Sequence, residues 1–158
     1  MNPFLLALAF AAGVAIAAQA AINGQLAANL GGYPIVAAFV SFALGTLVLG
    51  VLAVSAGGFG AALPQFGNQP LWRLTGGLLG AGAIFCTVLL APRLGLATLL
   101  ALVIAGQLVS AITIDHFGLL GVATRTATPA RFIGAAITIC GVLFALFGDR
   151  LLRLSNVA

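Results

Sequence analysis

Apolar runs of about 20 residues recur along the chain, separated by short segments rich in glycine, proline and polar residues. Each run is long enough, as a helix, to cross a hydrocarbon core of about 30 Å. Lipid leaves no partner for unpaired backbone groups, and the two-residue alternation of a barrel strand is absent, so helices are predicted. The predicted spans are about residues 3–30, 33–56, 72–92, 95–116 and 131–148. The pattern therefore predicts an all-α integral membrane protein, with one domain of five transmembrane helices over residues 1–158.

The connections between the spans differ in character. GGYP is a tight link between the first two spans, and the segment GGFGAALPQFGNQP after the second is expected to be a loop near the membrane surface. Trp72 and Arg73 are expected to anchor the start of the third span at the interface. The first run lacks a basic n-region and is longer than a signal-peptide core of about 7 to 15 residues, so it is expected to be a retained span.

The composition agrees with a membrane protein and narrows the chemistry. Hydrophobic residues make up 63% of the 158 positions and charged residues 5%. Cys86 and Cys140 have no second cysteine or histidine at a metal-ligand spacing, so both are expected to be buried free thiols. No metal site, phosphate loop or dinucleotide fingerprint is found, and the scattered arginines do not form a nucleic-acid surface, so we expect no cofactor and no nucleic-acid partner.

The basic residues are balanced between the two sides of the membrane. With five spans the termini lie on opposite sides, and three of the six arginines fall on each side: Arg73, Arg125 and Arg131 with the N-terminus, and Arg93, Arg150 and Arg153 opposite. Since Lys and Arg in short loops set orientation, this balance gives almost no preference. We expect either dual insertion, with two copies forming a ten-helix antiparallel (inverted) homodimer, or an orientation imposed by a paralogous partner or another neighbouring protein.

Small residues at short spacings predict close approaches between helices. Gly76 and Gly80 repeat at four residues in the third span, and Ser41 and Gly45 do so in the second. The fifth span carries Gly134, Gly141 and Gly148 at seven-residue spacing. A helix contact is the favoured interpretation of these glycines.

Four amides lie within the first span. At about 100° per residue, Gln19 and Asn23 share one face, and Gln25 and Asn29 lie on nearly the opposite face. Amides in hydrocarbon commonly form interhelical hydrogen bonds. So many amides in one short segment also favour a polar cavity.

The fourth span holds a second polar strip, within GQLVSAITIDHFG. Gln107 lies near its middle and Ser110 one turn further on, whereas Asp115 is about 12 Å beyond Gln107, at the membrane boundary. Asp115 and His116 are either an ordinary interfacial pair that contacts Arg125 or Arg131, or a gate that responds to protons, since imidazoles titrate near neutral pH.

The segments QAAINGQLAANLG, SFALG, GGLLGAG, APRLG, GQLVSAITIDHFGLLG and RFIGAAITICGVLFA together touch all five spans. On these segments the sequence resembles the YdcZ-like family, a five-span bacterial family of the drug/metabolite transporter superfamily. The resemblance implies a multi-pass protein of the bacterial inner membrane with a transport role. It also implies relatives that occur singly, in adjacent pairs or fused into ten-span chains, so that one unit is half a transporter.

We therefore expect a transporter, not an enzyme, that moves a small polar neutral or zwitterionic solute by alternating access between two inverted copies. The predicted solute site consists of uncharged groups: Gln19, Asn23, Ser41, Gln107 and Ser110. A small-multidrug-exporter-like protein is one alternative, although the first three spans offer no carboxylate to a cation. A channel and a non-transporting scaffold subunit are the others. A hydrolytic triad is disfavoured, because the adjacent Asp115 and His116 point about 100° apart on a helix.

Overall fold

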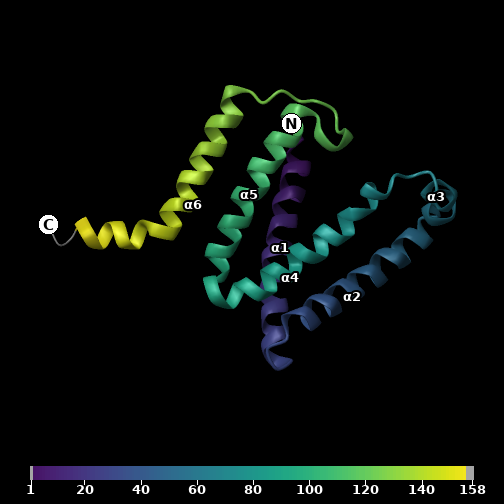
Figure 1. Cartoon of the computed structure of the whole chain (residues 1–158), viewed down its shortest axis with the longest axis horizontal. Coiled ribbons are helices and arrows are strands. Elements are labelled where there is room, and N and C mark those ends of the chain that lie inside the picture. The colour runs from purple at the N-terminus through teal and green to yellow at the C-terminus, as the bar shows by residue number, and fades with distance from the viewer. Residues whose placement is uncertain (1, 156–158) are drawn as a thin grey trace. The chain divides into compact units, whose positions relative to one another are not determined.

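Within the part of the chain that this computed structural model describes, five helices are long and apolar enough to cross a membrane, which confirms the predicted all-helical architecture (Figure 1). The elements are α1 (Pro3–Asn29), α2 (Pro34–Ser55), the short α3 (Gly58–Phe66), the 3-10 turn η1 (Leu71–Thr75), α4 (Gly76–Leu94), α5 (Leu96–Phe117), the 3-10 turn η2 (Leu119–Gly121) and α6 (Pro129–Ser155). The chain divides into two compact units, Met1–Arg93 and Leu94–Ala158, and each is described by itself.

The structure describes residues 2–155, and near the end of α6 the side chains of residues 150, 151 and 153–155 lie outside this description. The side chains of Arg150 and Arg153, which belong to the balance of arginines, are therefore outside the described residues.

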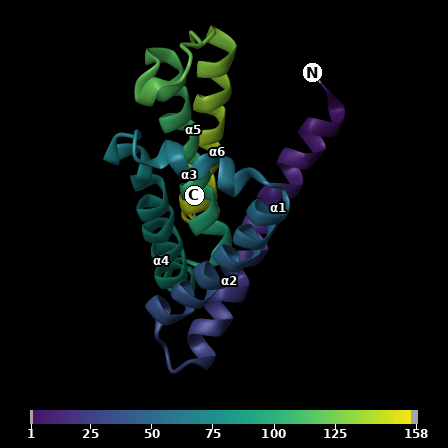
Figure 2. The ribbon, with the colours of Figure 1, turned by 90° about the vertical axis from the view of Figure 1, so that its right-hand side faces the viewer.

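Local sequence signals set the ends of α1. Pro3 occupies the first helical position, and the Asn2 side chain caps the helix by accepting a hydrogen bond of 3.0 Å from the backbone N–H of Phe4. The helix ends at Asn29, and the chain then turns at Gly31 and Gly32, whose φ angles of 79° and 83° suit glycine. This reversal lets α2 begin at Pro34 and return beside α1 (Figure 2).

Small residues let three helices of the first unit meet. Ala27 of α1, Ala37 of α2 and Val88 of α4 form a buried cluster, with Ala37 and Val88 at 0% and 1% exposure. Helix association in lipid depends on such close packing, because burial away from water supplies no driving force there. The cluster lies about one turn from Asn23 along α1, so it fixes the part of α1 that carries the polar face.

The segment after α2, expected to be a loop, contains the nine-residue helix α3. Its apolar residues Phe59, Leu63 and Phe66 recur at helical spacing and remain exposed. At the end of this segment, Arg73 donates a 2.8 Å hydrogen bond to Gln69 and lies over the Trp72 ring, 5.4 Å from its centroid. The anchoring of Trp72 and Arg73 at the interface stays a prediction. Glycine and proline density concealed the short amphipathic pattern of α3.

The second unit is a hairpin of α5 and α6. α5 begins after Gly95 and is capped at its end by Gly118. Gly118 adopts the left-handed conformation with φ 62°, and its backbone N–H donates a hydrogen bond to the Ile114 carbonyl. An extended segment, residues 122–128, then leads to the first turn of α6 (Figure 1). The last turn of α5 and the first turn of α6 thus lie at the same end of the hairpin.

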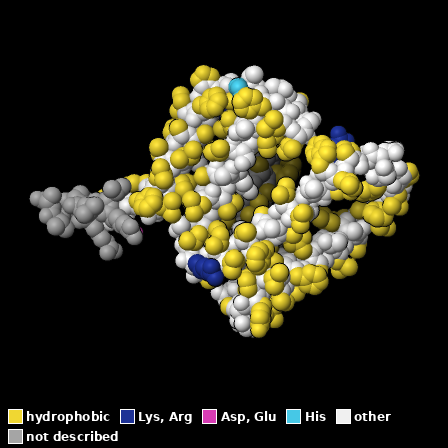
Figure 3. Space-filling model, in the orientation of Figure 1, with side chains coloured by type: hydrophobic (Ala, Val, Ile, Leu, Met, Phe, Trp, Pro, Cys, Tyr) yellow, Lys and Arg dark blue, Asp and Glu magenta, His cyan; other side chains and the backbone are white. Residues whose placement is uncertain are grey.

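Apolar side chains are spread over the visible face of the described residues, and few charged groups lie among them (Figure 3). This is the surface of a protein solvated by lipid. The two cysteines are free, as predicted, but Cys86 and Cys140 are exposed, so the prediction that they are buried was wrong. An apolar neighbourhood in sequence cannot tell a thiol in a helix contact from one that faces lipid.

Candidate functional site

The main polar cluster of the first unit joins α1 to α2. Gln19 and Asn23 lie four residues apart on one face of α1, as predicted, and both point to Ser41 of α2. Gln19 Nε2 donates to Ser41 Oγ at 3.3 Å, and Asn23 Nδ2 donates to the same oxygen at 3.1 Å. Asn23, with 4% exposure, is the buried polar residue among those that the structure describes. The structure thus brings together three of the five predicted solute-site residues.

This cluster keeps hydrogen-bonding capacity. Ser41 Oγ accepts two hydrogen bonds and retains its hydroxyl proton, which can be donated. Within the described part of the chain, the amide oxygens of Gln19 and Asn23 receive no hydrogen bond. Donor and acceptor groups without formal charge therefore remain available at one place, which suits a polar solute without net charge.

The second amide pair of α1 is separate from this cluster. The side chain of Asn29 donates a 3.0 Å hydrogen bond to the backbone carbonyl of Gln25 on its own helix, and both residues are exposed. The two amide pairs of α1 therefore have different surroundings. The Gln19 and Asn23 pair joins two helices, and the Gln25 and Asn29 pair does not.

Gln107 and Ser110 lie on α5, in the second unit, and both are exposed. Neither side chain has a hydrogen-bond partner among the described residues. Their participation in one site with Gln19, Asn23 and Ser41 stays a prediction.

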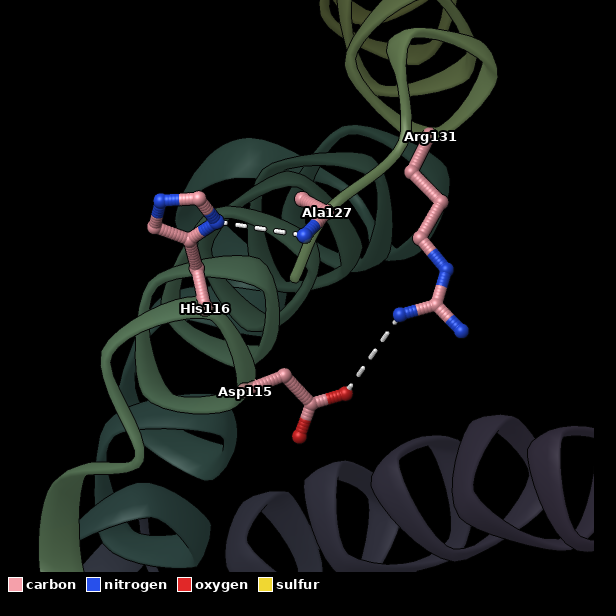
Figure 4. A network of polar contacts seen from close by, with 4 residues as sticks. All are labelled: Asp115, His116, Ala127 and Arg131. Atoms are coloured by element: carbon pink, nitrogen blue, oxygen red, sulfur yellow. Dashed lines mark hydrogen bonds and ion pairs between the residues drawn. The ribbon is translucent and has the colours of Figure 1, made fainter. Parts of the chain in front are cut away.

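The last turn of α5 is tied to the segment that follows it. The Asp115 carboxylate extends toward Arg131 in the first turn of α6, with Oδ2 and Nη1 3.9 Å apart, while the His116 ring turns to the other side (Figure 4). The backbone N–H of Arg125 donates to the Asp115 carbonyl at 2.7 Å, and that of Ala127 donates to His116 Nδ1 at 3.1 Å. We call these three contacts the α5 clamp.

The clamp fixes the orientation of the His116 ring. Nδ1 accepts the Ala127 N–H, which leaves Nε2 as the other polar atom of the ring. The ring also contacts Phe117 and Phe132 edge-on, with centroids 4.8 Å and 6.2 Å away. A proton on Nδ1 would place two donors against each other and release Ala127.

Gly118 lets the segment turn back over the helix end. Its φ of 62° is the left-handed conformation, and a Cβ added there would lie 2.5 Å from Thr124 Oγ1. The clamp therefore depends on the absence of a side chain at this position.

A family model with the description "Putative inner membrane exporter, YdcZ" matches residues 4–144. The chain belongs to the YdcZ family. No curated protein and no solved structure matches it. Membership, together with five helices able to cross a membrane, makes the chain a multi-pass inner-membrane protein of an exporter family. The description of the family is that of a transporter class.

The predicted packing glycines of this YdcZ-family chain have different surroundings. Gly80 of α4 lies against α2, since a Cβ there would be 3.6 Å from Phe42 Cζ. Gly76, Gly134 and Gly141 have nothing within 4 Å of a Cβ position in the described chain. Gly80 thus lies beside the Phe42 side chain, and close helix packing at these four glycines stays a prediction.

The sequence did not decide which groups contact Asp115 and His116 at the end of α5. Of the two arginines considered, Arg131 pairs with Asp115 through its side chain, whereas Arg125 contributes its backbone N–H. The Ala127 N–H that bonds His116 was missed, because a backbone donor in an irregular segment leaves no mark in the sequence. The one available signal was the short polar segment between the two helices.

Proposed function

We propose that this chain exports a small polar solute that is neutral or zwitterionic, by alternating access in a pair of inverted copies. The observation that carries the proposal is the Ser41 hydroxyl held by the amides of Gln19 and Asn23, with capacity left for a further partner. In hydrocarbon a polar group without such a partner is destabilised, so a cluster of this kind favours a solute that supplies hydrogen bonds. Gln107 and Ser110 of α5 complete the proposed lining.

The lack of charge near this cluster argues against lipophilic cations. The sequence places no acidic residue before Asp115, so α1, α2 and α4 carry no countercharge for a cation. A cation near the membrane midplane without a carboxylate is strongly disfavoured. A solute with no net charge avoids this penalty.

Transport is tested by counterflow with purified protein in liposomes. We expect saturable exchange for at least one member of a panel of radiolabelled amino acids, sugars and polyols, each tested against the same unlabelled compound. Conductance far above carrier turnover would instead support a channel. Export of tetraphenylphosphonium with no exchange across the panel would support a multidrug exporter. No flux with intact assembly would support a scaffold subunit.

Two inverted copies form the proposed transport unit. Five spans put the termini on opposite sides, and three arginines lie on each side, so positive charge gives neither orientation an advantage. Transporters commonly achieve alternating access with inverted halves, and two copies of opposite orientation supply such halves. A paralogous partner of fixed, opposite orientation would give the same architecture.

Orientation is tested with C-terminal reporters that are active on one side of the membrane only. We expect signal on both sides in similar amounts. Arg93→Ala and Arg125→Ala each remove one exposed arginine from opposite sides, so they should shift the populations in opposite directions. The Arg125 backbone N–H, which contributes to the α5 clamp, is retained in that variant. Every C-terminus on one side would exclude the homodimer and leave the paralogous pair.

The α5 clamp is the proposed gate, with Asp115 and His116 as its polar members. Protonation of His116 at Nδ1 would release the Ala127 N–H and free the segment before α6. Asparagine at this position places an acceptor close to that of Nδ1 but does not titrate. Counterflow by His116→Asn with an unchanged pH profile would remove His116 from this role.

A further inference from the structure

A groove between α5 and α6, with a volume of about 410 Å³, leads to the Asp115 and Arg131 pair. Its volume falls within the range of about 300 to 1,000 Å³ that is typical of small-molecule sites. Leu108, Ala111 and Ile112 of α5 and Gly134 and Ala135 of α6 form its apolar walls. The groove therefore combines one positive and one negative group with a surface that suits a short hydrocarbon chain.

The pair is loosely joined. Its closest atoms are 3.9 Å apart, well beyond the roughly 2.7 to 2.9 Å of a charge-assisted hydrogen bond. The two side chains are 49% and 42% exposed for Arg131 and Asp115, respectively. Each charged group thus keeps donor or acceptor capacity directed at the groove that both line.

The positions of Asp115 and Arg131 relative to the helix dipoles indicate that this ion pair does more than join two helices. Asp115 lies in the last turn of α5, where the helix dipole disfavours an anion, and Arg131 lies in the first turn of α6, where it disfavours a cation. The reverse placement would give the same ion pair with both dipoles favourable. For a ligand, however, the observed placement is favourable, because each helix dipole reinforces the charge at its end. Arg131 and the start of α6 form a positive pole, and Asp115 and the end of α5 form a negative pole.

We propose that this groove binds a zwitterionic group, with the ligand's carboxylate or phosphate at Arg131 and its ammonium at Asp115, and the attached hydrocarbon along the apolar walls. Both an aliphatic α-amino acid and the ethanolamine headgroup of a phospholipid have this chemistry. The net charge of such a group is zero, which matches a groove with one charge of each sign.

This proposal rests on the proposed function in one respect. The zwitterion bound in the groove is also the transported solute only if the chain is a transporter. In an inverted pair, the same end of the hairpin faces opposite sides of the membrane in the two copies. Each side would then have one such groove, open to a zwitterion on that side of the membrane.

Binding is measured on the full-length protein in dodecyl maltoside, a detergent without charge, by saturation-transfer NMR and calorimetry. The probes are L-alanine, L-valine, L-leucine and dihexanoyl phosphatidylethanolamine. We expect at least one to bind, and at least tenfold weaker binding of its single-charge counterparts, such as N-acetyl-L-leucine and L-leucinamide for leucine. An amino acid that binds marks a solute site, whereas binding of the lipid alone marks a headgroup site. Failure of all four probes overturns the proposal.

Variants locate the ligand. Asp115→Asn and Arg131→Gln should each weaken binding at least tenfold, whereas Asp149→Asn and Arg125→Gln, which remove the same kinds of charge outside the groove, should not. The charge swap Asp115→Arg with Arg131→Asp keeps an ion pair and reverses its fit to the helix dipoles. We expect it to be at least as thermally stable as the wild type, yet to bind at least tenfold more weakly. A purely structural pair would show no difference in binding for any of these variants, and that result overturns the proposal.

Binding and counterflow separate this inference from the proposed function. Binding of a probe in the groove without any counterflow would refute the proposed transport and still support the groove as a binding site. Flux that is unchanged in Asp115→Asn and Arg131→Gln, with no binding to the wild-type groove, would refute the groove and leave transport.

Discussion

Replacing Asn23 with leucine is expected to reduce counterflow at least tenfold while the protein still folds and enters the membrane. Asn23 is buried and donates to Ser41 across two helices, so leucine removes one interhelical hydrogen bond of about 0.6 to 2 kcal/mol and places apolar atoms in the polar cluster. That loss is small for a helical membrane protein whose helices also pack at Ala27, Ala37 and Val88. Counterflow and thermal unfolding of the purified variant are the two measurements.

Asn29→Leu is the matched control on the same helix. Asn29 bonds to its own helix at the Gln25 carbonyl and is exposed, so its replacement should leave counterflow close to that of the wild type. Normal flux in Asn23→Leu would show that the amide only joins helices. Equal losses in both variants would point to a general effect of leucine on α1.

Replacing Gly118 with alanine is expected to destabilise the second unit. Alanine in the left-handed conformation costs about 1 to 2 kcal/mol, and its Cβ would lie 2.5 Å from Thr124 Oγ1, so the Thr124 hydroxyl must also shift. We expect a lower midpoint of thermal unfolding in detergent and faster proteolysis of residues 122–128. A midpoint equal to that of the wild type would contradict the described end of α5.

Gly106→Ala serves as the comparison within α5. Gly106 lies inside the helix and has nothing within 4 Å of a Cβ position, so alanine should be neutral or stabilise the helix by up to about 1 kcal/mol. Adding Thr124→Ala to Gly118→Ala removes the close contact and leaves the backbone strain. The double variant should therefore recover part of the loss, and the remainder measures the backbone contribution.

The polar residues show how much of the candidate site could be predicted from the sequence. Gln19 and Asn23 were predicted to share a face because their spacing of four residues is a local property of the helix. That Gln19 and Asn23 both reach Ser41, which lies 22 and 18 residues further on, respectively, depends on how the turn at Gly31 and Gly32 places α2 against α1. The spacing alone therefore predicted a polar face on α1, whereas the packing of α2 determined that Ser41 is the hydrogen-bond partner of this face.

The end of α5 illustrates the same division. Asp115 and His116 were predicted at the end of their span because a run of apolar residues stops there. The choice of Arg131 over Arg125 for the carboxylate, and of a backbone N–H for the imidazole, follows from the path of residues 122–128. That path is set by a left-handed glycine and by contacts between segments, which a pattern of residue types does not contain.

By itself the sequence determined that this chain has five helices long and apolar enough to cross a membrane, belongs to the YdcZ family and carries its few polar groups on defined stretches of those helices. The tertiary structure alone decided which helix faces meet, which cysteines are exposed, and which donors reach Ser41 and His116. The physical reason is the solvent. In water an apolar stripe marks the inner face of a helix, but in lipid every face is apolar, so small residues and hydrogen bonds select the contacts.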